Sequence, residues 1–335
     1  MSLLIIGMTG GTHIGGSLCR AAKELGIAPS FLDAESAFRA PRPIRRFCWR
    51  LMRRRPPRLH FFSKQVLGVC MEDRPARLLA TGIAPIDKGC LQRIGGLGVR
   101  RICYLTDDPW NNAHYAPWFI GALKYYDDIF STRRANIDDL KKIGCKNVEY
   151  LPFGYDPELF YPEKLAEEER QRYVSDIVFV GGADDDRVSY ISVLINAGFN
   201  VGLYGGYWDK YGATKNCTRG IVDTDTARKV ISSAKVALCL VRRANRDGSC
   251  MRTFEVPASG ACMLTEDTQE HRELFGEEGR AVIYFKTPHE MTRKAGWLMS
   301  HDNERRRLAE AAYRLVVGGK NRYKDRLVSM LKQKI

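Results

Sequence analysis

Two acidic residues stand close together in the C-terminal half of the sequence. Asp247 follows an apolar run, and Glu255 comes after seven intervening residues, just before Ala258-Ser259-Gly260. Carboxylates suit polyols, because each accepts two or more hydroxyl protons at a fixed geometry. With one acid on a loop after a strand and the other near a helix start, both can face one ligand. We expect one to bind sugar hydroxyls and the other a ribose; the alternative is a pair of solvated loop acids.

Arginines and glycines suited to phosphate lie near these acids. Arg187 follows Gly181 and Gly182 at the end of an apolar strand, where a glycine turn and a guanidinium together neutralise a diphosphate. The alternative for Arg187 is an exposed side chain that offsets neighbouring aspartates. Arg246 and Arg252 flank the carboxylates, and we expect one or more of these arginines to face phosphate.

A glycine-rich loop near the start of the chain is a second candidate site. Gly10 and Gly11 stand between the predicted first strand and first helix, and His13 follows them. Glycines allow a backbone to approach a ligand closely, here at the positive end of a helix. We expect the loop to contact donor phosphates or the acceptor, with His13 near the reacting sugar; the alternative is a structural histidine.

The segment Thr106-Asp107-Asp108-Pro109-Trp110-Asn111-Asn112 follows another predicted strand. We expect Asp107 to contact acceptor hydroxyls or act as a base, and Asp108 to cap a helix that starts near Pro109, a common role for aspartate. His114, one turn further on, is another side chain that can line the same site.

The most basic part of the chain is residues 39–58, with nine arginines, no acid and several large apolar side chains. This mixture suits an interfacial helix on anionic lipid, or a site for an anionic acceptor such as a lipid diphosphate or a charged glycan. Prolines confine any helix to about residues 44–55. The alternative is a solvated basic flank of a packed helix. No recognition motif for nucleic acid accompanies the charge, so no specific nucleic-acid partner is expected.

The elements that must position these residues alternate between strand and helix along the whole chain. Strands without polar alternation, separated by helices, indicate parallel sheets covered on both faces. A proline-rich break near residues 153–169 predicts a division into residues 1–155 and 156–318, with residues 319–335 as a C-terminal helix that packs back on the first domain. In such folds, ligands bind at the carboxyl ends of the strands.

Composition excludes several classes of protein. The ten cysteines form no C-x-x-C pair and have no clustered histidines, which argues against a metal site and a disulfide framework and fits a reducing cytosol. The sequence shows no signal peptide and no stretch long enough to cross a membrane. The formal net charge of +14 attracts anionic partners. We expect a cytoplasmic protein, at most peripheral at the inner membrane surface.

Several segments together resemble the CgeB-like glycosyltransferases, relatives of the large retaining group with an acidic-x7-Glu motif. The resemblance covers most of the chain, and it is weak in residues 30–75. It rests on Asn245-Arg246-Asp247, on Arg252-Thr253-Phe254-Glu255-Val256-Pro257-Ala258, on Gly260 and Glu270-His271, on Phe179-Val180-Gly181-Gly182 followed by Arg187, on Thr106-Asp107-Asp108-Pro109-Trp110, and on Tyr323–Leu327.

The resemblance implies an α/β protein with the GT-B fold, in which two Rossmann-like doubly wound domains face each other across a cleft. It implies a nucleotide-sugar donor held mainly by the C-terminal domain, no metal and no further cofactor, and retention of configuration. Glu255 takes the place of the ribose-binding carboxylate. Asp247 takes the sugar-facing position, where the wider group usually has glutamate. The acceptor is expected to be a glycan, a lipid-linked molecule or another anion. The enzyme is expected to act in polysaccharide biosynthesis.

Two other functions remain open. The first-domain glycine loop resembles the fingerprint of NAD-dependent sugar-nucleotide epimerases and reductases, with Asp33 as the ribose acid. That loop is one residue shorter than the fingerprint, however. These enzymes also need a Tyr-x3-Lys pair, and the only nearby candidate, Tyr211–Lys215, lies beyond the predicted domain boundary. The other alternative is a non-catalytic protein that binds nucleotide-sugar.

Overall fold

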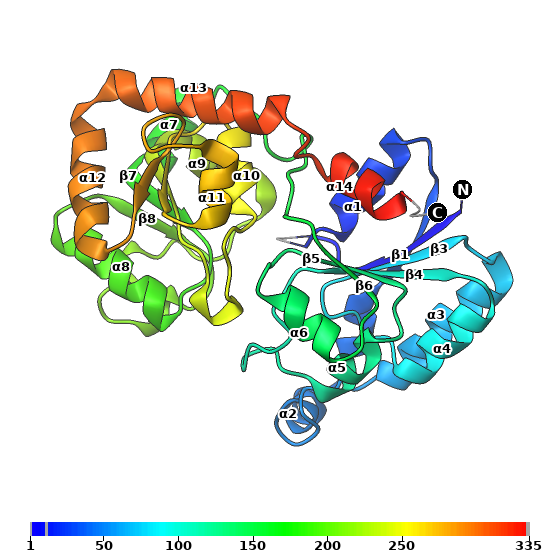
Figure 1. Ribbon diagram of the computed structural model, residues 1–335. Helices are drawn as coiled ribbons and strands as arrows, with labels where there is room; N and C mark the ends of the chain where they lie inside the picture. Colours follow the sequence, from blue (N-terminus) through cyan, green and yellow to red (C-terminus); the bar gives the residue numbers. More distant parts are fainter. Residues whose placement is uncertain (1, 11–12, 333–335) are drawn as a thin grey trace. The chain divides into compact units, whose positions relative to one another are not determined.

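The computed structural model describes residues 2–10 and 13–332, which form two compact α/β units (Figure 1). The first unit consists of Met1–Pro152, Ala244–Asp247 and Tyr323–Ile335, and the second of Phe153–Arg243 and Gly248–Arg322. The chain therefore leaves the second unit for four residues before returning to it. Among the described residues, no helix has both the length and the apolar character needed to cross a bilayer.

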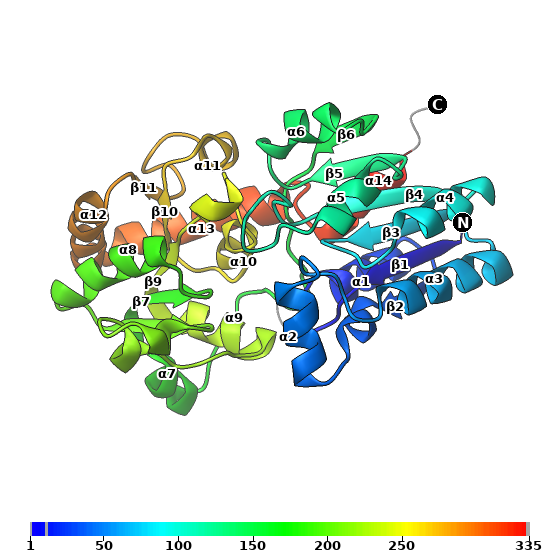
Figure 2. The same ribbon diagram turned by 90° about the horizontal axis from the view of Figure 1, so that it is seen from below.

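The first unit is built on a six-stranded sheet in the order β2-β1-β3-β4-β5-β6, with every neighbouring pair parallel (Figure 2). Its strands are β1 (Leu3–Gly7), β2 (Pro29–Asp33), β3 (Arg77–Thr81), β4 (Arg100–Leu105), β5 (Asp128–Ser131) and β6 (Asn147–Tyr150). Its helices are α1 (Gly15–Glu24), the 3-10 helix η1 (Ala34–Phe38), α2 (Arg42–Arg50), α3 (Leu59–Asp73), α4 (Lys88–Gly96), α5 (Pro117–Leu123), α6 (Asn136–Lys142) and α14 (Tyr323–Leu331).

Helices cover both faces of this sheet. On β1, Leu4 and Ile6 belong to the core under α3, α4 and α5, whereas Leu3 and Ile5 point to the opposite face, as the two-residue period of a strand requires. Figure 1 shows α1 and α14 side by side on that opposite face. The central strand β1 is therefore apolar and buried on both faces, as expected for a parallel sheet, whereas the edge strands β2 and β6 contain polar residues and are partly exposed.

The second unit has a five-stranded parallel sheet in the order β11-β10-β9-β7-β8. Its strands are β7 (Ser175–Val180), β8 (Val201–Tyr204), β9 (Ala234–Cys239), β10 (Met263–Glu266) and β11 (Ile283–Phe285). Its helices are α7 (Glu167–Tyr173), α8 (Asp185–Asn196), α9 (Thr224–Ser233), α10 (Arg252–Ala258), α11 (Gln269–Phe275), α12 (Pro288–Ser300) and α13 (Asp302–Gly318). One core lies under α9, α10 and the end of α13, and the other under α8 and α12. The two-unit α/β fold predicted from the sequence is confirmed.

Two local predictions were wrong. No helix starts near Pro109: Asp108 accepts the backbone N–H of Trp110 at 3.0 Å in a turn, and the next helix, α5, begins only at Pro117. The basic helix α2 begins at Arg42 because Pro43 falls within its first turn, where the missing N–H is harmless. It ends before Arg53 and Arg54, which adopt left-handed backbone conformations with φ of 48° and 60°.

The loops that follow β7 and β8 are in close contact at Gly205. This residue has φ of 148°, and a Cβ built on it would lie 2.2 Å from the carbonyl oxygen of Gly181. The two loops are joined by hydrogen bonds from Gly181 N to Tyr204 O at 2.8 Å and from Ala183 N to Gly206 O at 2.9 Å. A side chain at residue 205 therefore forces the loop after β7 to move.

We predict that Gly205→Ala lowers the free energy of unfolding by about 2 kcal/mol or more, because it adds both backbone strain and a backbone clash. Gly212→Ala is the control, since Gly212 lacks a positive φ and a Cβ there meets nothing within 4 Å. The control should change stability by less than about 0.5 kcal/mol in urea unfolding. Equal effects of the two substitutions would contradict the close approach at Gly205.

Candidate functional site

Glu255 lies in the first turn of α10 and is 2% exposed. Its carboxylate forms an ion pair with Arg252, one turn earlier on the same helix. The Nε of Arg252 donates to the carbonyl oxygen of Val180 at 3.1 Å, where β7 ends. A buried carboxylate needs such a partner, because desolvation of an unpaired charge is costly. The pair therefore fixes Glu255 at the carboxyl edge of the sheet.

The glycine turn after β7 is held by Arg187. From α8, this guanidinium donates to the carbonyl oxygens of Gly182 at 3.1 Å and Leu240 at 3.2 Å, so it joins the ends of β7 and β9. Arg187 is buried and lies near Asp184, with 3.7 Å between Nε and Oδ2. The second unit thus brings Gly181, Gly182, Arg187, Arg252 and Glu255 to one sheet edge.

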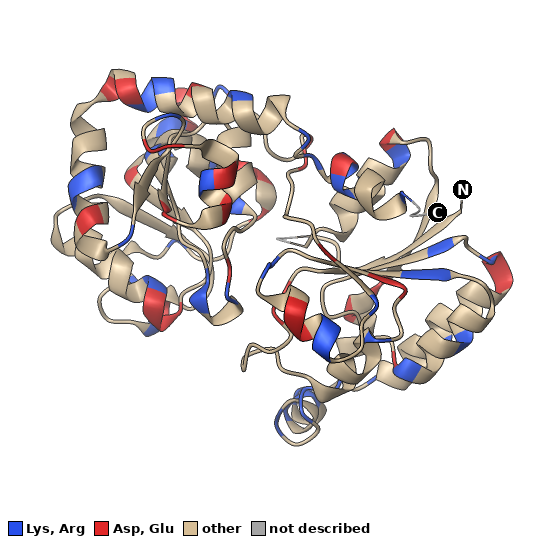
Figure 3. Cartoon of the chain, viewed as in Figure 1, with Lys and Arg blue, Asp and Glu red and all other residues tan. Residues whose placement is uncertain are grey.

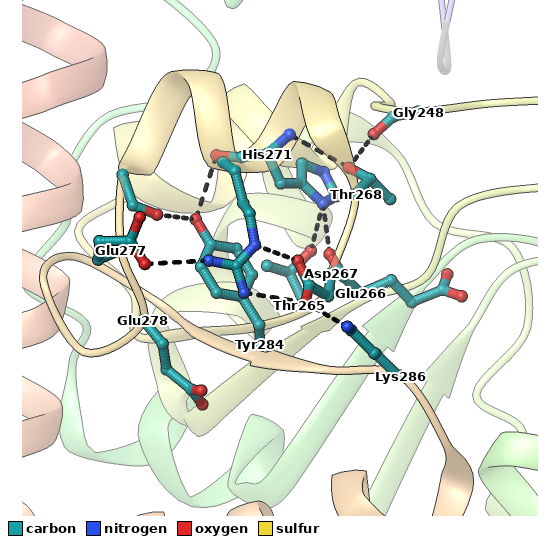
Figure 4. A network of polar contacts seen from close by, with 12 residues as sticks. Gly248, Thr265, Glu266, Asp267, Thr268, His271, Glu277, Glu278, Tyr284 and Lys286 are labelled. Atoms are coloured by element: carbon teal, nitrogen blue, oxygen red, sulfur yellow. Dashed lines mark hydrogen bonds and ion pairs between the residues drawn. The ribbon is translucent and has the colours of Figure 1, made fainter.

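A buried histidine positions α10. His271 on α11 is fully buried, and its Nε2 lies 2.9 Å from the hydroxyl of Thr253 on α10. Its Nδ1 lies 2.8 Å from the carbonyl oxygen of Glu266 (Figure 4). A neutral ring that donates from Nδ1 and accepts at Nε2 satisfies both contacts. Burial lowers the pKa of His271 to about 4, so the ring is neutral at pH 7.

The loop before α10 is fixed by the cap of α11. Thr268, the N-cap of α11, accepts the backbone N–H of His271 at 3.1 Å, and its hydroxyl donates to Gly248 O at 2.6 Å (Figure 4). A Cβ at Gly248 would overlap the carboxylate of Glu270. The Glu270-His271 pair noted in the sequence therefore supports this loop and helix.

A second buried carboxylate at this edge was not predicted from the sequence. Glu266, at the end of β10, accepts the N–H of Val241 at 2.6 Å and pairs with Arg243 at 2.5 Å. Burial raises the pKa of Glu266, against the opposing effect of Arg243. The sequence signal that could have identified Glu266 is its position as the last residue of an apolar strand.

Residues 244–247 belong to the first unit, and they include two predicted site residues. Arg246 donates to Asp108 Oδ2 at 2.6 Å and to Asp139 Oδ2 at 2.7 Å, and these carboxylates, with Asp108 the stronger cause, raise the pKa of Arg246. Asp247 accepts from Arg133 Nε at 2.5 Å, and both side chains are 5% exposed or less. Arg133, just after β5, was missed by the sequence reasoning.

The remaining predicted residues lie in loops of the first unit. Asp107, after β4, is partly exposed and accepts a hydrogen bond from the hydroxyl of Thr106 at 3.4 Å. Gly10 has φ of 85°, and its carbonyl accepts the N–H of the exposed His13 at 3.1 Å. His114 is half-buried. Gly11 lies outside the described residues, and within residues 2–10 and 13–332 no cluster of side chains has a metal-binding arrangement.

The sequence is similar to one protein family and to one curated protein. Residues 190–332 match the family described as Glycosyl transferase-like. The spore protein CgeB of Bacillus subtilis (strain 168) is 22% identical over 232 residues, which cover 64% of this chain and 69% of that protein.

Solved structures share the fold over nearly the whole chain. Sucrose-phosphate synthase from Thermosynechococcus elongatus has a TM-score of 0.67 at 10% identity, covering 98% of each chain. A putative UDP-N-acetylglucosamine 2-epimerase from Listeria monocytogenes has a TM-score of 0.61 at 11% identity, and the match covers 99% of this chain and 95% of that one. An Anabaena protein in complex with UDP-glucose has a TM-score of 0.59 at 11% identity, and the match covers 98% of this chain and 97% of that one.

These solved structures show that the chain has the GT-B fold, and residues 190–332 are similar to glycosyl transferase-like proteins. The resemblance to the CgeB-like glycosyltransferases seen in the sequence is confirmed.

We predict that Arg133→Met lowers the free energy of unfolding by about 3–5 kcal/mol, because it removes the cation beside the buried Asp247. The double variant Arg133→Met/Asp247→Asn should recover much of this loss, since it also removes the buried charge. Arg93→Met, at an exposed position on α4, should cost less than about 0.5 kcal/mol. Urea unfolding measures these variants and the single Asp247→Asn variant, and strictly additive effects at 133 and 247 would refute the coupling.

We also predict a pH-dependent stability that depends on His271. The pKa of this side chain is about 4 in the folded protein and about 6.5 in an unfolded chain. Below pH 6.5 the unfolded state gains a proton that the folded state does not bind, so stability is present above 6.5 and lost as pH falls toward 4. The loss approaches about 3 kcal/mol.

Urea unfolding of the wild type and His271→Asn at several pH values from 7.5 to 4 measures this effect. The variant should be less stable at pH 7.5, and the difference between the two proteins should shrink as pH falls. Parallel curves over this range would show that His271 is not held neutral.

Proposed function

We propose that this protein is a glycosyltransferase that moves a sugar from a nucleoside-diphosphate donor to a glycan, lipid-linked or other anionic acceptor. The observation that carries the proposal is the buried Arg252–Glu255 pair beside the Gly181–Gly182 turn, at the carboxyl edge of the second sheet. Ligands bind at this edge in open α/β sheets. The match of residues 190–332 to the glycosyl transferase-like family supports the same reading.

In this proposal, Glu255 accepts hydrogen bonds from the ribose of the donor. Its position is fixed by Arg252 and by the His271–Thr253 contact, so it requires little reorganisation when the donor binds. Uracil is the first base to test, because the structurally similar Anabaena protein was solved with UDP-glucose.

The glycine turn and its arginine bind the diphosphate. The backbone N–H of Gly182 and the positive charge of Arg187 stabilise the negative charge that develops on the leaving diphosphate, while Gly181, whose N–H donates to Tyr204 O, shapes the turn. Because Arg187 donates to two backbone carbonyls, it acts partly by holding the turn in place. Arg246 and Arg252, each already paired with a carboxylate, are further candidates for a phosphate contact, and no metal is required in this proposal.

The first unit supplies the acceptor side. In this proposal Asp247, which is paired with Arg133, binds hydroxyls of the transferred sugar, while Gly10, Gly11, His13 and Asp107 contact the acceptor or the donor phosphates. The reaction retains the anomeric configuration, as in the wider group that the sequence resembles. We place the enzyme in the cytoplasm or at the inner membrane surface, in polysaccharide biosynthesis.

A sugar-nucleotide epimerase is the second candidate. A putative UDP-N-acetylglucosamine 2-epimerase shares the fold almost as fully as the synthase does, so fold alone does not separate the two reactions. The family match favours transfer. An epimerase converts UDP-N-acetylglucosamine without an acceptor, whereas a transferase releases UDP in proportion to glycosylated product.

We predict that nucleoside diphosphates of one base stabilise the protein against heat and that Glu255→Gln weakens this effect. Saturation at about 100 times the dissociation constant adds roughly 2.7 kcal/mol, which a thermal-shift assay detects. Loss of a hydrogen bond to the carboxylate should weaken binding by about tenfold to a hundredfold. UDP, GDP, ADP, UDP-glucose and NAD⁺ are the ligands to compare.

Glu163→Gln is the matched control. Glu163 also pairs with a buried arginine of the second unit, Arg228, at 2.8 Å, and this pair is outside the proposed donor site. The control should bind nucleoside diphosphates as the wild type does. If NAD⁺ alone stabilises the protein, and Glu255→Gln leaves that stabilisation unchanged, the result would instead favour a dinucleotide-dependent reaction.

A further inference from the structure

Residues 39–58 form a basic segment of the first unit, here called the basic excursion, whose two ends lie close together. The N–H of Arg58 donates to the carbonyl oxygen of Ala37 at 3.0 Å, so the chain returns to the point where it left η1. Between these ends lie α2 and a following turn. All nine arginines of the segment lie within this excursion, and Figure 3 shows α2 with basic residues and no acidic ones.

The basic excursion, together with Phe38, lines an open pocket of about 640 Å³, a volume typical of ligand sites. Trp49 and Phe38 provide apolar surface in its wall. Six guanidinium-bearing residues line it: Arg42, Arg45, Arg46, Arg50, Arg54 and Arg55.

None of these six arginines has a carboxylate partner among the described residues. This distinguishes them from Arg133, Arg246 and Arg252, whose charges are neutralised by aspartate or glutamate. Guanidinium groups bind phosphate oxygens through two parallel hydrogen bonds, which makes arginine the preferred residue for phosphate recognition. The pocket is therefore complementary to a ligand with several phosphate charges.

The far side of the pocket is built with backbone strain. Arg53 and Arg54 both adopt left-handed conformations, which side-chain-bearing residues rarely do. Arg54 is anchored by its Nη1, which donates to Tyr115 O at 2.9 Å, and by its carbonyl, which accepts from Trp118 Nε1 at 3.2 Å. Its Nε is buried without a hydrogen-bond partner in the described structure. A fixed, strained wall with an unsatisfied donor indicates a preformed site.

Large apolar side chains on the same excursion are exposed. Ile44, Phe47 and Met52 are about half-exposed, and Leu51 is 72% exposed. A soluble phosphate ester does not account for these side chains, whereas a lipid surface does: phosphate headgroups face the arginines while apolar groups enter the boundary of the acyl chains. Each arginine near an anionic membrane also gains from its surface potential.

We propose that the pocket of the basic excursion binds the phosphate headgroups of anionic lipids at a membrane surface, with Phe47 and Leu51 inserted beside them. This site is separate from the proposed donor site, and its binding requires no sugar transfer. The observations that carry it are the unpaired arginines, the pocket they line and the exposed apolar side chains.

Sedimentation with vesicles tests the proposal on the full-length protein. Vesicles of phosphatidylcholine with 30% phosphatidylglycerol should bind the protein, and vesicles of phosphatidylcholine alone should not. Arg45→Gln/Arg46→Gln should lower the partition coefficient by about 25-fold, at about fivefold for each arginine. Phe47→Ser/Leu51→Ser should also lower it. All four positions are exposed, and unchanged melting temperatures would show that the variants fold.

Arg306→Gln/Arg314→Gln removes the same two charges from exposed positions on α13 and is the control. It should retain vesicle binding; an equal loss would mean that net charge alone drives the binding and would overturn the proposal. Inorganic pyrophosphate separates the lipid from a soluble ligand. Stabilisation by pyrophosphate, with vesicle binding absent or indifferent to Phe47→Ser/Leu51→Ser, would assign the pocket to a soluble phosphate and reject the membrane role.

Discussion

The all-parallel order of both sheets is the constraint on which the candidate site depends. In a parallel sheet every strand ends at the same edge, so the loops that leave β7, β9 and β10 must gather there. Residues far apart in sequence, such as Val180, Leu240 and Glu266, become neighbours at this edge. The chain uses the gathered backbone carbonyls as acceptors for Arg187 and Arg252, which then fix the loops that carry the predicted chemistry.

Gathering charged residues at a buried edge creates a second requirement, that each charge has a partner. Glu255, Glu266 and Asp247 are nearly inaccessible, and each is matched by an arginine. Such pairs add little net stability compared with apolar packing, yet the loss of one partner is costly. They are therefore best understood as devices that fix geometry. The basic excursion differs, because its charges are not matched within the described chain.

The sequence predicted the fold well because the elements have strong apolar patterns. Apolar runs located the strands, and the segments between them located the helices. The pattern could not show that residues 244–247 pack with the first unit, because the partners Asp108, Arg133 and Asp139 lie over a hundred residues away. It also missed the roles of His271 and Glu266. Their function in the fold depends on burial, which arises only when separate strands come together.

The chain order also has a consequence for synthesis on the ribosome. The first unit includes α14, which packs on α1 and brings Lys324 Nζ to 3.8 Å from Glu24, as well as the four residues before Gly248. Residues 2–152 therefore emerge without their last helix and without the partners of Arg133 and Asp108. The second unit has all of its residues once Arg322 has been made, before α14 is available. Although its residues come first, the N-terminal unit must be the last to complete its fold.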